Sequence, residues 1–274
     1  MADLPECNEL LVEQQGSRLY VTINRPESRN ALSAEVIDEL LAIIDAIEGD
    51  RSIRTVILRG AGGTFCAGGD MKTFQQAFQS EAPTDGGKDP VAKFNRTFGD
   101  FMLRFNALPQ TVVAVIEGAA MGGGMGLVCA TDIAIAMADA KFALSETSLG
   151  IPPAQIAPFV VQRLGLTQTR ALALSGTRFK GDRALELGLV HHVAKDADEL
   201  DATLKEVLNA IGKCAPGANA ETKKILMDSL TKPVTEVLDD AADAFARQLR
   251  GEEGPAGVMA FMQKQPAPWV ETVE

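Results

Sequence analysis

Two glycine-bearing turns, far apart in the sequence, carry the backbone groups best suited to chemistry. The first covers residues 67–69 and the second covers residues 122–124. The second turn follows a β-branched run at 112–116 that reads as a buried strand, and it precedes an apolar segment at 125–129 that predicts the start of a buried helix. Glycines at a helix start present bare N–H groups, with the positive end of the helix dipole behind them. The sequence therefore predicts a place that holds negative charge.

A single carboxylate completes the candidate site. Each turn could donate one N–H to the same oxygen, and two such donors form an oxyanion hole for a carbonyl that gains negative charge during a reaction. Glu146 lies in an apolar loop between Ser145 and Thr147, a setting that favours an altered pKa and a general acid/base role. Simple turn geometry would also explain the glycines, and a solvated position would also explain the glutamate. The residues alone therefore indicate an anion-binding or oxyanion-binding α/β enzyme.

Other kinds of site fit the sequence less well. The chain has no G-x-S-x-G turn, and its only histidines are the adjacent pair His191 and His192, so a Ser-His-Asp hydrolase would need a serine that the sequence does not identify. No glycine-rich loop ends in Gly-Lys-Ser/Thr, and no His, Cys or carboxylate cluster has metal-ligand spacing. The segment 122–127 partly matches a dinucleotide-binding turn but lacks its third glycine. We therefore expect no metal site.

Alternating strand and helix patterns surround these turns. Ser33 caps a predicted helix, and strands and helices then alternate as far as residue 193. Residues 79–90, with several prolines and glycines, predict a mobile surface excursion, and from residue 198 the pattern is helical throughout. The sequence thus predicts an α/β core at 1–195, which holds the site, and a helical region at 196–274. The other predicted strands are 10–15, 19–23, 55–58, 132–137 and 190–193, with an extended piece at 141–144, and the other predicted helices of the core are 94–107, 157–164, 167–174 and 183–187.

Composition limits the partners of the chain. Its 274 residues are 46% hydrophobic and 23% charged, which is ordinary for a globular protein with a substantial core. The net charge of -11 argues against binding to nucleic acid or to a membrane surface, so an anionic ligand must meet locally placed Lys or Arg side chains. We see no signal peptide and no membrane span, and the four cysteines lack CxxC spacing. A cytoplasmic protein with reduced thiols is expected.

Several short motifs occur along almost the whole chain. They are Asn24-Arg25-Pro26 with Asn30-Ala31-Leu32, and then the segments 65–70, 117–124, 131–133, 142–152 and 188–190. In order and spacing they resemble the enoyl-CoA hydratase (crotonase) family, over residues 10 to 264. The resemblance implies a spiral of ββα turns with a C-terminal helical trimerisation region, a homotrimer or a dimer of trimers, and action on an acyl-CoA thioester. Coenzyme A would be part of the substrate, and no separate cofactor is implied.

The resemblance also suggests roles for individual residues. By position, the amides of Gly69 and Gly123 resemble the family's oxyanion hole for the thioester carbonyl, in agreement with the residue pattern. Lys264 matches a C-terminal lysine that in relatives reaches a CoA phosphate, often across a subunit boundary. A solvated surface position would explain Arg29 or Lys264 equally well. The other residues that resemble parts of the coenzyme A site are Arg29 and Ala31 in the loop for adenosine and pantetheine, Ala67 in the first turn, and the stretch Asp70, Met71 and Lys72.

The chain departs from the family at one catalytic position. Hydratases of this family use two glutamates to hold and activate water; Glu146 fills the second position, but Gly126 stands at the first. A lone acid/base group also suits a Δ3-Δ2 enoyl-CoA isomerase, which moves one proton along the acyl chain. Hydration remains open if another polar group, with Gln155 as the candidate, helps to seat the water. A non-catalytic acyl-CoA-binding member is the third alternative.

The segment after Glu146 suggests a substrate class. Residues 153–158 replace the family's usual glycine-rich turn and, with 146–150, resemble the isohexenylglutaconyl-CoA hydratase branch of acyclic terpene utilisation. The substrate of that branch is bulky, branched and bears a second carboxylate. Gly126 would leave room for such a group, and Gln155 could face its carboxylate. The resemblance therefore favours hydration of a branched glutaconyl-type thioester.

Overall fold

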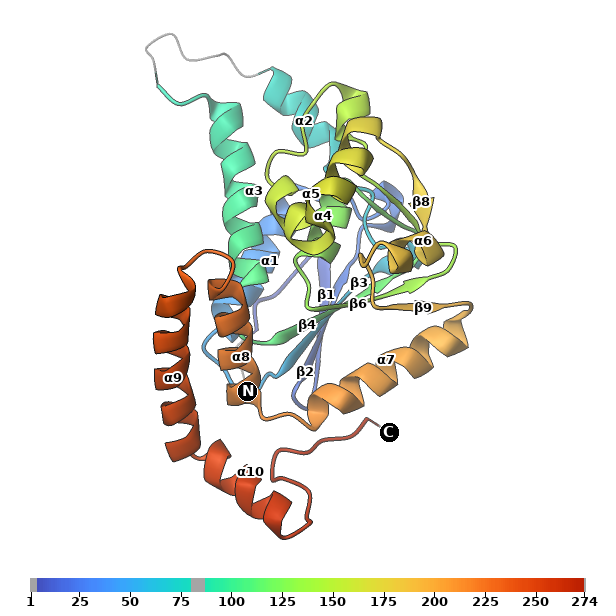
Figure 1. The fold of residues 1–274 in the computed structure, drawn as a ribbon. Coiled ribbons are helices and arrows are strands. Elements are labelled where there is room, and N and C mark those ends of the chain that lie inside the picture. The colour runs from blue at the N-terminus through green and yellow to red at the C-terminus, as the bar shows by residue number, and fades with distance from the viewer. Residues whose placement is uncertain (1–3, 80–86, 274) are drawn as a thin grey trace.

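The computed structural model describes residues 4–79 and 87–273. A six-stranded sheet lies between helices on both of its faces, and a helical arm extends from one end of the molecule (Figure 1). This architecture is the predicted alternation of strands and helices followed by helices alone. Residues 80–86, which belong to the predicted excursion, lie outside the described residues.

The main sheet is mostly parallel. Its strand order is β1-β2-β3-β4-β6-β9, in which β1 pairs with β2 antiparallel and every other pair of neighbours is parallel. The central strands β3 and β4 bury nearly every residue, as expected for strands that are covered on both faces. The six strands are β1 (Leu10–Gln15), β2 (Arg18–Ile23), β3 (Thr55–Gly60), β4 (Thr111–Ile116), β6 (Ile133–Met137) and β9 (His192–Ala194).

A second, small sheet lies beside the main one. Two isolated bridges extend it toward earlier parts of the chain, because Cys66 pairs with Ala120 and Gly69 pairs with Leu32. The sequence pattern does not predict its first strand, since three residues carry no periodic signal. The small sheet consists of β5 (Ala119–Met121), β7 (Lys141–Ala143) and β8 (Phe179–Lys180).

The helices begin and break where local chemistry requires it. Ser33 caps α1 as predicted, and its hydroxyl accepts a hydrogen bond from Val36 N. The two helices predicted at 157–164 and 167–174 form one element, α5, whose backbone breaks at Gly165 with φ 73°. The helices are α1 (Ala34–Ile47), α2 (Met71–Phe78), α3 (Pro90–Asn106), α4 (Gly123–Cys129), α5 (Ala157–Ser175), α6 (Gly181–Glu186), α7 (Ala197–Gly212), α8 (Pro216–Asp228), α9 (Val234–Arg250) and α10 (Glu253–Met262), with a 3₁₀ turn η3 (Glu146–Leu149).

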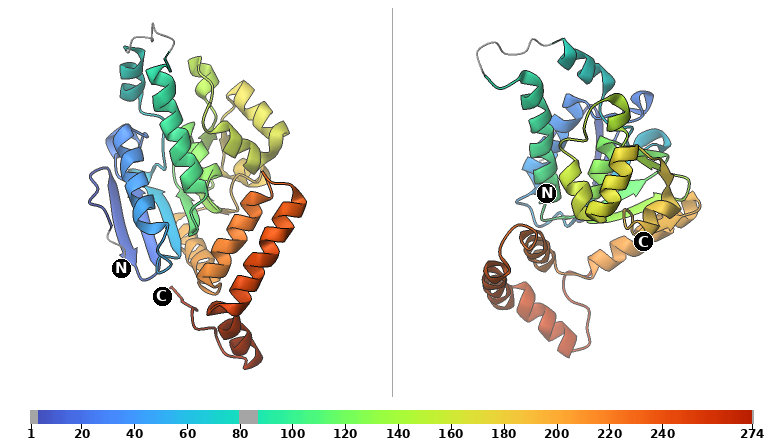
Figure 2. Two further views of the ribbon diagram at one scale, coloured as in Figure 1. Left: turned by 90° about the vertical axis from the view of Figure 1, so that its left-hand side faces the viewer. Right: turned by 45° about the horizontal axis from the view of Figure 1, so that its top comes forward.

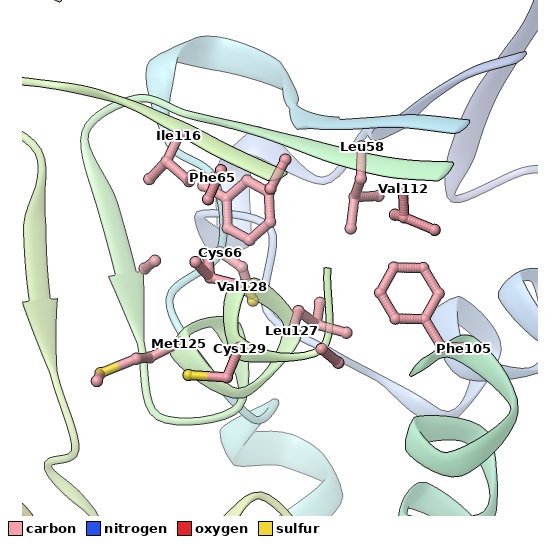
Figure 3. Close-up of a cluster of buried hydrophobic side chains, with 14 of the residues drawn as sticks. Leu58, Phe65, Cys66, Phe105, Val112, Ile116, Met125, Leu127, Val128 and Cys129 are labelled. Atoms are coloured by element: carbon pink, nitrogen blue, oxygen red, sulfur yellow. The ribbon is translucent and has the colours of Figure 1, made fainter. Parts of the chain in front are cut away.

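Helix α4 lies in the larger hydrophobic core. Its residues 124–129 are all buried. Figure 3 shows Leu127 of this helix among Leu58 of the sheet and Phe105 of α3. Because side chains at such density leave little room for displacement, burial on all sides fixes the helix axis and holds the first residue, Gly123, in one place.

The opposite face of the sheet is covered by α7. Leu200 and Val207 of this helix pack against Ile57 and Val113 of the sheet. The helices α8, α9 and α10 form an arm that projects from the sheet (Figures 1 and 2). Within the described ranges, no helix combines the length and the apolar character needed to cross a bilayer. Large apolar side chains are exposed on the arm, namely Leu226, Leu230, Val234, Leu238, Phe245, Leu249, Val258, Met259, Phe261 and Met262.

Candidate active site

Residues 66–70 run between two backbone partners, with a bend at Gly68, where φ is 103°. On one side, Cys66 pairs with β5 through hydrogen bonds of 2.9 and 3.0 Å. On the other side, Ala67 N donates to Arg29 O at 3.0 Å. The segment thus bonds to β5 at Cys66 and to the 29–32 loop at Ala67, Gly68 and Asp70.

The Gly69 amide points toward the side of β5. Leu32 bonds both neighbours of Gly69: its N–H donates to Gly68 O at 2.8 Å, and its carbonyl accepts from Asp70 N at 3.0 Å. Gly69 therefore turns its own N–H away from Leu32, toward the end of β5 where α4 begins. Within residues 4–79 and 87–273, this N–H has no hydrogen-bond acceptor.

The Gly123 amide belongs to the first residue of α4. The first four N–H groups of a helix have no partner inside it. Gly122 precedes it with φ 48° and ψ -117°, a backbone conformation that strains every residue except glycine. A Cβ atom placed on Gly123 would lie 3.9 Å from Gly69 N, and one placed on Gly68 would lie 3.8 Å from Gly123 N. The two glycine turns of the sequence thus meet at one point.

Glu146 opens the turn η3 and contacts the same place. Its Oε1 lies 2.7 Å from the position that a Cβ atom on Gly122 would occupy. Its Oε2 is buried and has no hydrogen-bond partner in the described part of the chain. Burial raises the pKa of Glu146, and a hydrogen bond from its own backbone N–H lowers the pKa by less. This carboxylate lies beside the Gly69 and Gly123 amides, which have no acceptor within the described ranges, so it can move a proton next to a carbonyl that the amides hold.

The raised pKa of Glu146 predicts a stability effect. The folded state binds this proton more tightly than the unfolded state, so the stabilisation is complete below the ordinary pKa of 4.5 and is lost as the pH rises through the raised pKa. Glu146→Gln cannot ionise and avoids this loss. Thermal denaturation of both proteins from acid to alkaline pH should give a Tm difference that favours the variant more as the pH rises. A difference that does not change with pH would contradict the raised pKa.

Two apolar side chains line the same place, Leu32 from the motif at 30–32 and Phe98, which belongs to no motif. A Cβ atom on Gly123 would lie 3.2 Å from Leu32 Cδ1 and 3.7 Å from Phe98 Cζ. Phe98 belongs to α3, so this helix forms a wall beside the two amides. The only signal for Phe98 in the sequence is its place in the predicted helix 94–107, which does not say what the helix contacts.

Gly126 does not open into free space, which corrects the expectation that it makes room for a branched substrate. A Cβ atom on Gly126 would overlap Ile156 Cγ2 and would lie 2.7 Å from Ile156 Cβ. Ile156 is 3% exposed and fills the volume into which a side chain at position 126 would project. The sequence does not reveal this contact because the two residues are far apart in the chain.

The contact between Gly126 and Ile156 predicts the effect of adding one methyl group. Gly126→Ala should destabilise the fold by about 1–3 kcal/mol, because the new methyl overpacks the core. In an Ile156→Gly background the same change should cost less than about 0.5 kcal/mol, since the Ile156 Cγ2 and Cβ atoms that the methyl would meet are then both absent. Urea denaturation of the four proteins measures this coupling. Equal costs in both backgrounds would show that the methyl meets some other group.

Gln155 is bonded to α3. Its Nε2 donates to Asn95 Oδ1 at 2.8 Å. A Cβ atom on Gly99 would overlap Gln155 Oε1 and lie 3.0 Å from Gln155 Cδ, so a glycine is needed for this close approach. That Gln155 also faces a substrate carboxylate stays a prediction. In this structure its amide holds the loop before α5 against α3.

The predicted coenzyme A residues fall into two groups. Arg29 and Lys72 are exposed at the two ends of the 66–70 segment, where Ala67 N bonds to the Arg29 carbonyl and Lys72 N bonds to Asp70 Oδ1 at 2.8 Å. Lys264 follows α10, in the arm that Figure 1 draws at the opposite end of the molecule from α2 and well away from α4 in the core. Within one chain, Lys264 does not join the others. Of the remaining two predicted residues, Ala31 is buried and Met71 is 61% exposed.

The His191 ring is held by a backbone group of β6. His191 Nδ1 accepts a hydrogen bond from Ala134 N at 3.0 Å, and burial lowers the pKa of His191 to about 4. The ring is therefore neutral and engaged by the backbone, which does not suit a catalytic triad. In the parts of the chain that the structure describes, no group of three or more His, Cys, Asp or Glu side chains is arranged to hold a metal ion.

Comparisons with known proteins agree with one another. The family model described as enoyl-CoA hydratase/isomerase matches residues 13–272. The crystal structure of an enoyl-CoA hydratase/isomerase from Marinobacter aquaeolei is 49% identical, with a TM-score of 0.93, and covers 97% of this chain and 100% of that chain. The structure of Pseudomonas aeruginosa AtuE is also 49% identical, with a TM-score of 0.92, over 96% and 100% of the two chains. Enoyl-CoA hydratase EchA19 of Mycobacterium tuberculosis is 32% identical over 97% of this chain and 97% of its own length.

Proposed function

The chain belongs to the enoyl-CoA hydratase/isomerase family, and on that basis we propose that it hydrates an α,β-unsaturated acyl-CoA thioester. The predicted crotonase-like α/β fold with its C-terminal helical region is confirmed by the solved relatives. Membership indicates an enzyme of enoyl-CoA chemistry, by hydration or by isomerisation. The choice of hydration and the nature of the acyl group are the proposal.

One observation carries the proposal. The Gly69 and Gly123 amides lie beside each other and have no acceptors among the residues that the structure describes, and the Glu146 carboxylate contacts the turn that holds Gly123. Two converging donors suit an oxygen that becomes negative, and removing one such donor typically costs about 2.7 to 4 kcal/mol of transition-state stabilisation. The Glu146 carboxylate lies beside these donors, where the reaction needs a group that transfers a proton. This combination fits an enolate-like transition state better than it fits a binding site alone.

The hydration step then follows from these groups. The thioester carbonyl accepts hydrogen bonds from the Gly69 and Gly123 amides, which draw electron density from C3 toward the oxygen. Glu146 takes a proton from a water molecule as the water oxygen bonds to C3, and the carbon–carbon double bond becomes an enolate. The protonated Glu146 then returns a proton to C2, so that one water molecule has been added. The raised pKa of Glu146 suits a group that must both accept and donate a proton.

For the acyl group we propose a branched glutaconyl type, such as isohexenylglutaconyl-CoA. Support comes from the resemblance of segments 146–150 and 153–158 to that branch. Room for the branch does not come from Gly126, because Ile156 fills that volume. The amides of Asn95 and Gln155 instead supply polar groups on the α3 wall, one turn from Phe98, that suit a second carboxylate.

One observation favours isomerisation as the second candidate. Ile156 occupies the place into which a first glutamate at position 126 would project, so Glu146 acts without a second carboxylate there. A single base is enough to move a proton between C2 and C4 of an enoyl thioester. A non-catalytic member that only binds acyl-CoA is the remaining alternative.

An absorbance screen separates these alternatives. Hydration of a 2-enoyl-CoA removes the absorbance of the conjugated thioester, whereas isomerisation of a 3-enoyl-CoA creates it. Straight and branched esters of both kinds should be tested with Glu146→Gln as the control. The proposal expects the largest signal to be a loss with a branched 2-enoyl ester that bears a second carboxylate. A gain with 3-enoyl esters alone would favour the isomerase, and binding of CoA without either signal would favour the non-catalytic alternative.

The assembly and location are proposed on separate grounds. The apolar side chains exposed on α8, α9 and α10 suit burial against further copies of the chain, and a homotrimer or a dimer of trimers would bring the Lys264 of one copy near the site of another. Light scattering of the purified protein should therefore give the mass of a trimer or a hexamer.

A cytoplasmic location fits the four unpaired cysteines. No cofactor other than the CoA of the substrate is proposed.

A further inference from the structure

One guanidinium joins the two backbone segments that meet at the bridge between Leu32 and Gly69. Arg25 Nη1 donates to Ala31 O at 2.6 Å and to Asp70 Oδ2 at 2.9 Å. Ala31 directly precedes Leu32, and Asp70 directly follows Gly69. A single nitrogen thus ties the two segments together next to the amide that would hold the thioester oxygen.

Asp70, at the end of this connection, is held through its backbone and through both of its carboxylate oxygens. Asp70 N donates to Leu32 O at 3.0 Å, Asp70 Oδ1 accepts from Lys72 N at 2.8 Å, and Arg25 bonds to Oδ2. The side chain of Asp70 is 8% exposed. Burial raises the pKa of Asp70, but the hydrogen bonds from Arg25 and from Lys72 N–H outweigh burial and hold the pKa below its usual range. Asp70 therefore stays ionised and keeps its pair with Arg25 at neutral pH.

The other side of the guanidinium is anchored as well. Arg25 Nε pairs with Glu9 Oε2 at 2.6 Å. Asn30 bonds to both backbone groups of Arg25. Asn30 N donates to Arg25 O, and Arg25 N donates to Asn30 Oδ1, both at 2.9 Å. Arg29 and Asn30 adopt left-handed φ angles of 55° and 58°. Such a backbone persists only where its surroundings fix it, so the loop is set before any ligand arrives.

We propose that Arg25 is a positioning residue that sets the direction of the Gly69 N–H and links it to the loop containing Ala31. This role rests on the proposed function, in which the Gly69 amide stabilises the thioester oxygen. Arg25 acts through Ala31 and Asp70 and does not touch the substrate. A displacement of about 1 Å in a catalytic group can cost about 10²-fold in rate. Loss of the connection therefore lowers kcat more than it weakens the binding of coenzyme A.

The test uses a ligand that reports the oxyanion hole directly. Acetoacetyl-CoA held by two amide donors binds as its enolate, which absorbs ultraviolet light that the keto form does not absorb. In Arg25→Met we expect loss of most of this absorbance and a fall in kcat of about 10- to 10²-fold, while the affinity for free CoA, measured by calorimetry, changes by less than about threefold. Glu9→Gln is the matched control: it removes the other carboxylate partner of Arg25, which bonds to neither Ala31 nor Asp70, and it should keep both signals.

The outcomes separate this role from the proposed function. If Arg25→Met does not fold, the double variant Arg25→Met/Asp70→Asn removes the unpaired carboxylate, and the same losses are expected. A folded Arg25 variant with wild-type kcat and enolate absorbance would overturn the positioning role, and so would an equal loss in Glu9→Gln. No enolate absorbance with the wild-type protein would overturn the proposed function, and the positioning role with it.

Discussion

Glu146→Gln is expected to lower kcat by about 10²- to 10⁴-fold, which is the range for loss of a general acid–base group. Glutamine keeps the shape of the side chain beside Gly122 but cannot exchange a proton. KM should change little, because the Gly69 and Gly123 amides that hold the carbonyl are unaltered. The measurement is the initial rate of absorbance change with the enoyl-CoA ester that the wild-type enzyme prefers.

The control for this variant removes a carboxylate elsewhere. Glu186 is exposed and pairs with Arg183 at 2.7 Å on the short helix α6. Glu186→Gln should therefore keep wild-type kcat. If Glu146→Gln retained kcat within about tenfold of the wild-type value, the proton transfer would belong to another group.

Gly122→Ala is expected to lower kcat by about 10²-fold through displacement of the same carboxylate. The added Cβ would lie 2.7 Å from Glu146 Oε1 and 3.3 Å from Glu146 Cδ, so the side chain must move away. Gly122 also has φ 48° and ψ -117°, and a residue with a Cβ in that conformation adds strain of about 1–3 kcal/mol. The variant should therefore lose both activity and stability, as measured by enzyme kinetics and by urea denaturation.

A second glycine separates the two effects of this change. Gly188 has a left-handed φ of 77°, and a Cβ atom there would meet no atom within 4 Å. Gly188→Ala should thus lose stability through backbone strain and keep its kcat. An equal fall of kcat in both variants would mean that destabilisation, and not the position of Glu146, explains the result.

The parts of the site with a local sequence signal were predictable. Glycine turns after a strand and before a helix have a defined meaning, since the bare backbone serves a turn and an N–H group at once. Residue types and spacing point to the two turns at 67–69 and 122–124, the family resemblance selects Gly69 and Gly123 within them, and an apolar loop points to Glu146. The N-cap at Ser33 and the long β-branched strands were found in the same way, because propensity and burial favour the same assignment.

The parts built by tertiary contacts were not predictable from one sequence. Phe98 and Ile156 reach the site from distant segments, and neither carries a motif. Strand β5 is too short for a periodic pattern, although it aligns the 66–70 segment. Arg25 was visible as part of a motif, but its bond to Asp70 depends on the folded loop. Sequence periodicity predicts which face of a helix or strand is buried, but it does not predict which other element packs against that face.

The most direct test of the central claim is the incorporation of deuterium into carbon when the enzyme acts on its enoyl-CoA ester in D₂O. The claim is that Glu146 moves a proton on a thioester whose oxygen is held by the Gly69 and Gly123 amides. Mass spectrometry should then find carbon-bound deuterium in the product of the wild-type enzyme, and far less with Glu146→Gln over the same time. Equal incorporation by the two proteins, or none by the wild type with any enoyl-CoA ester of the screen, would contradict the claim.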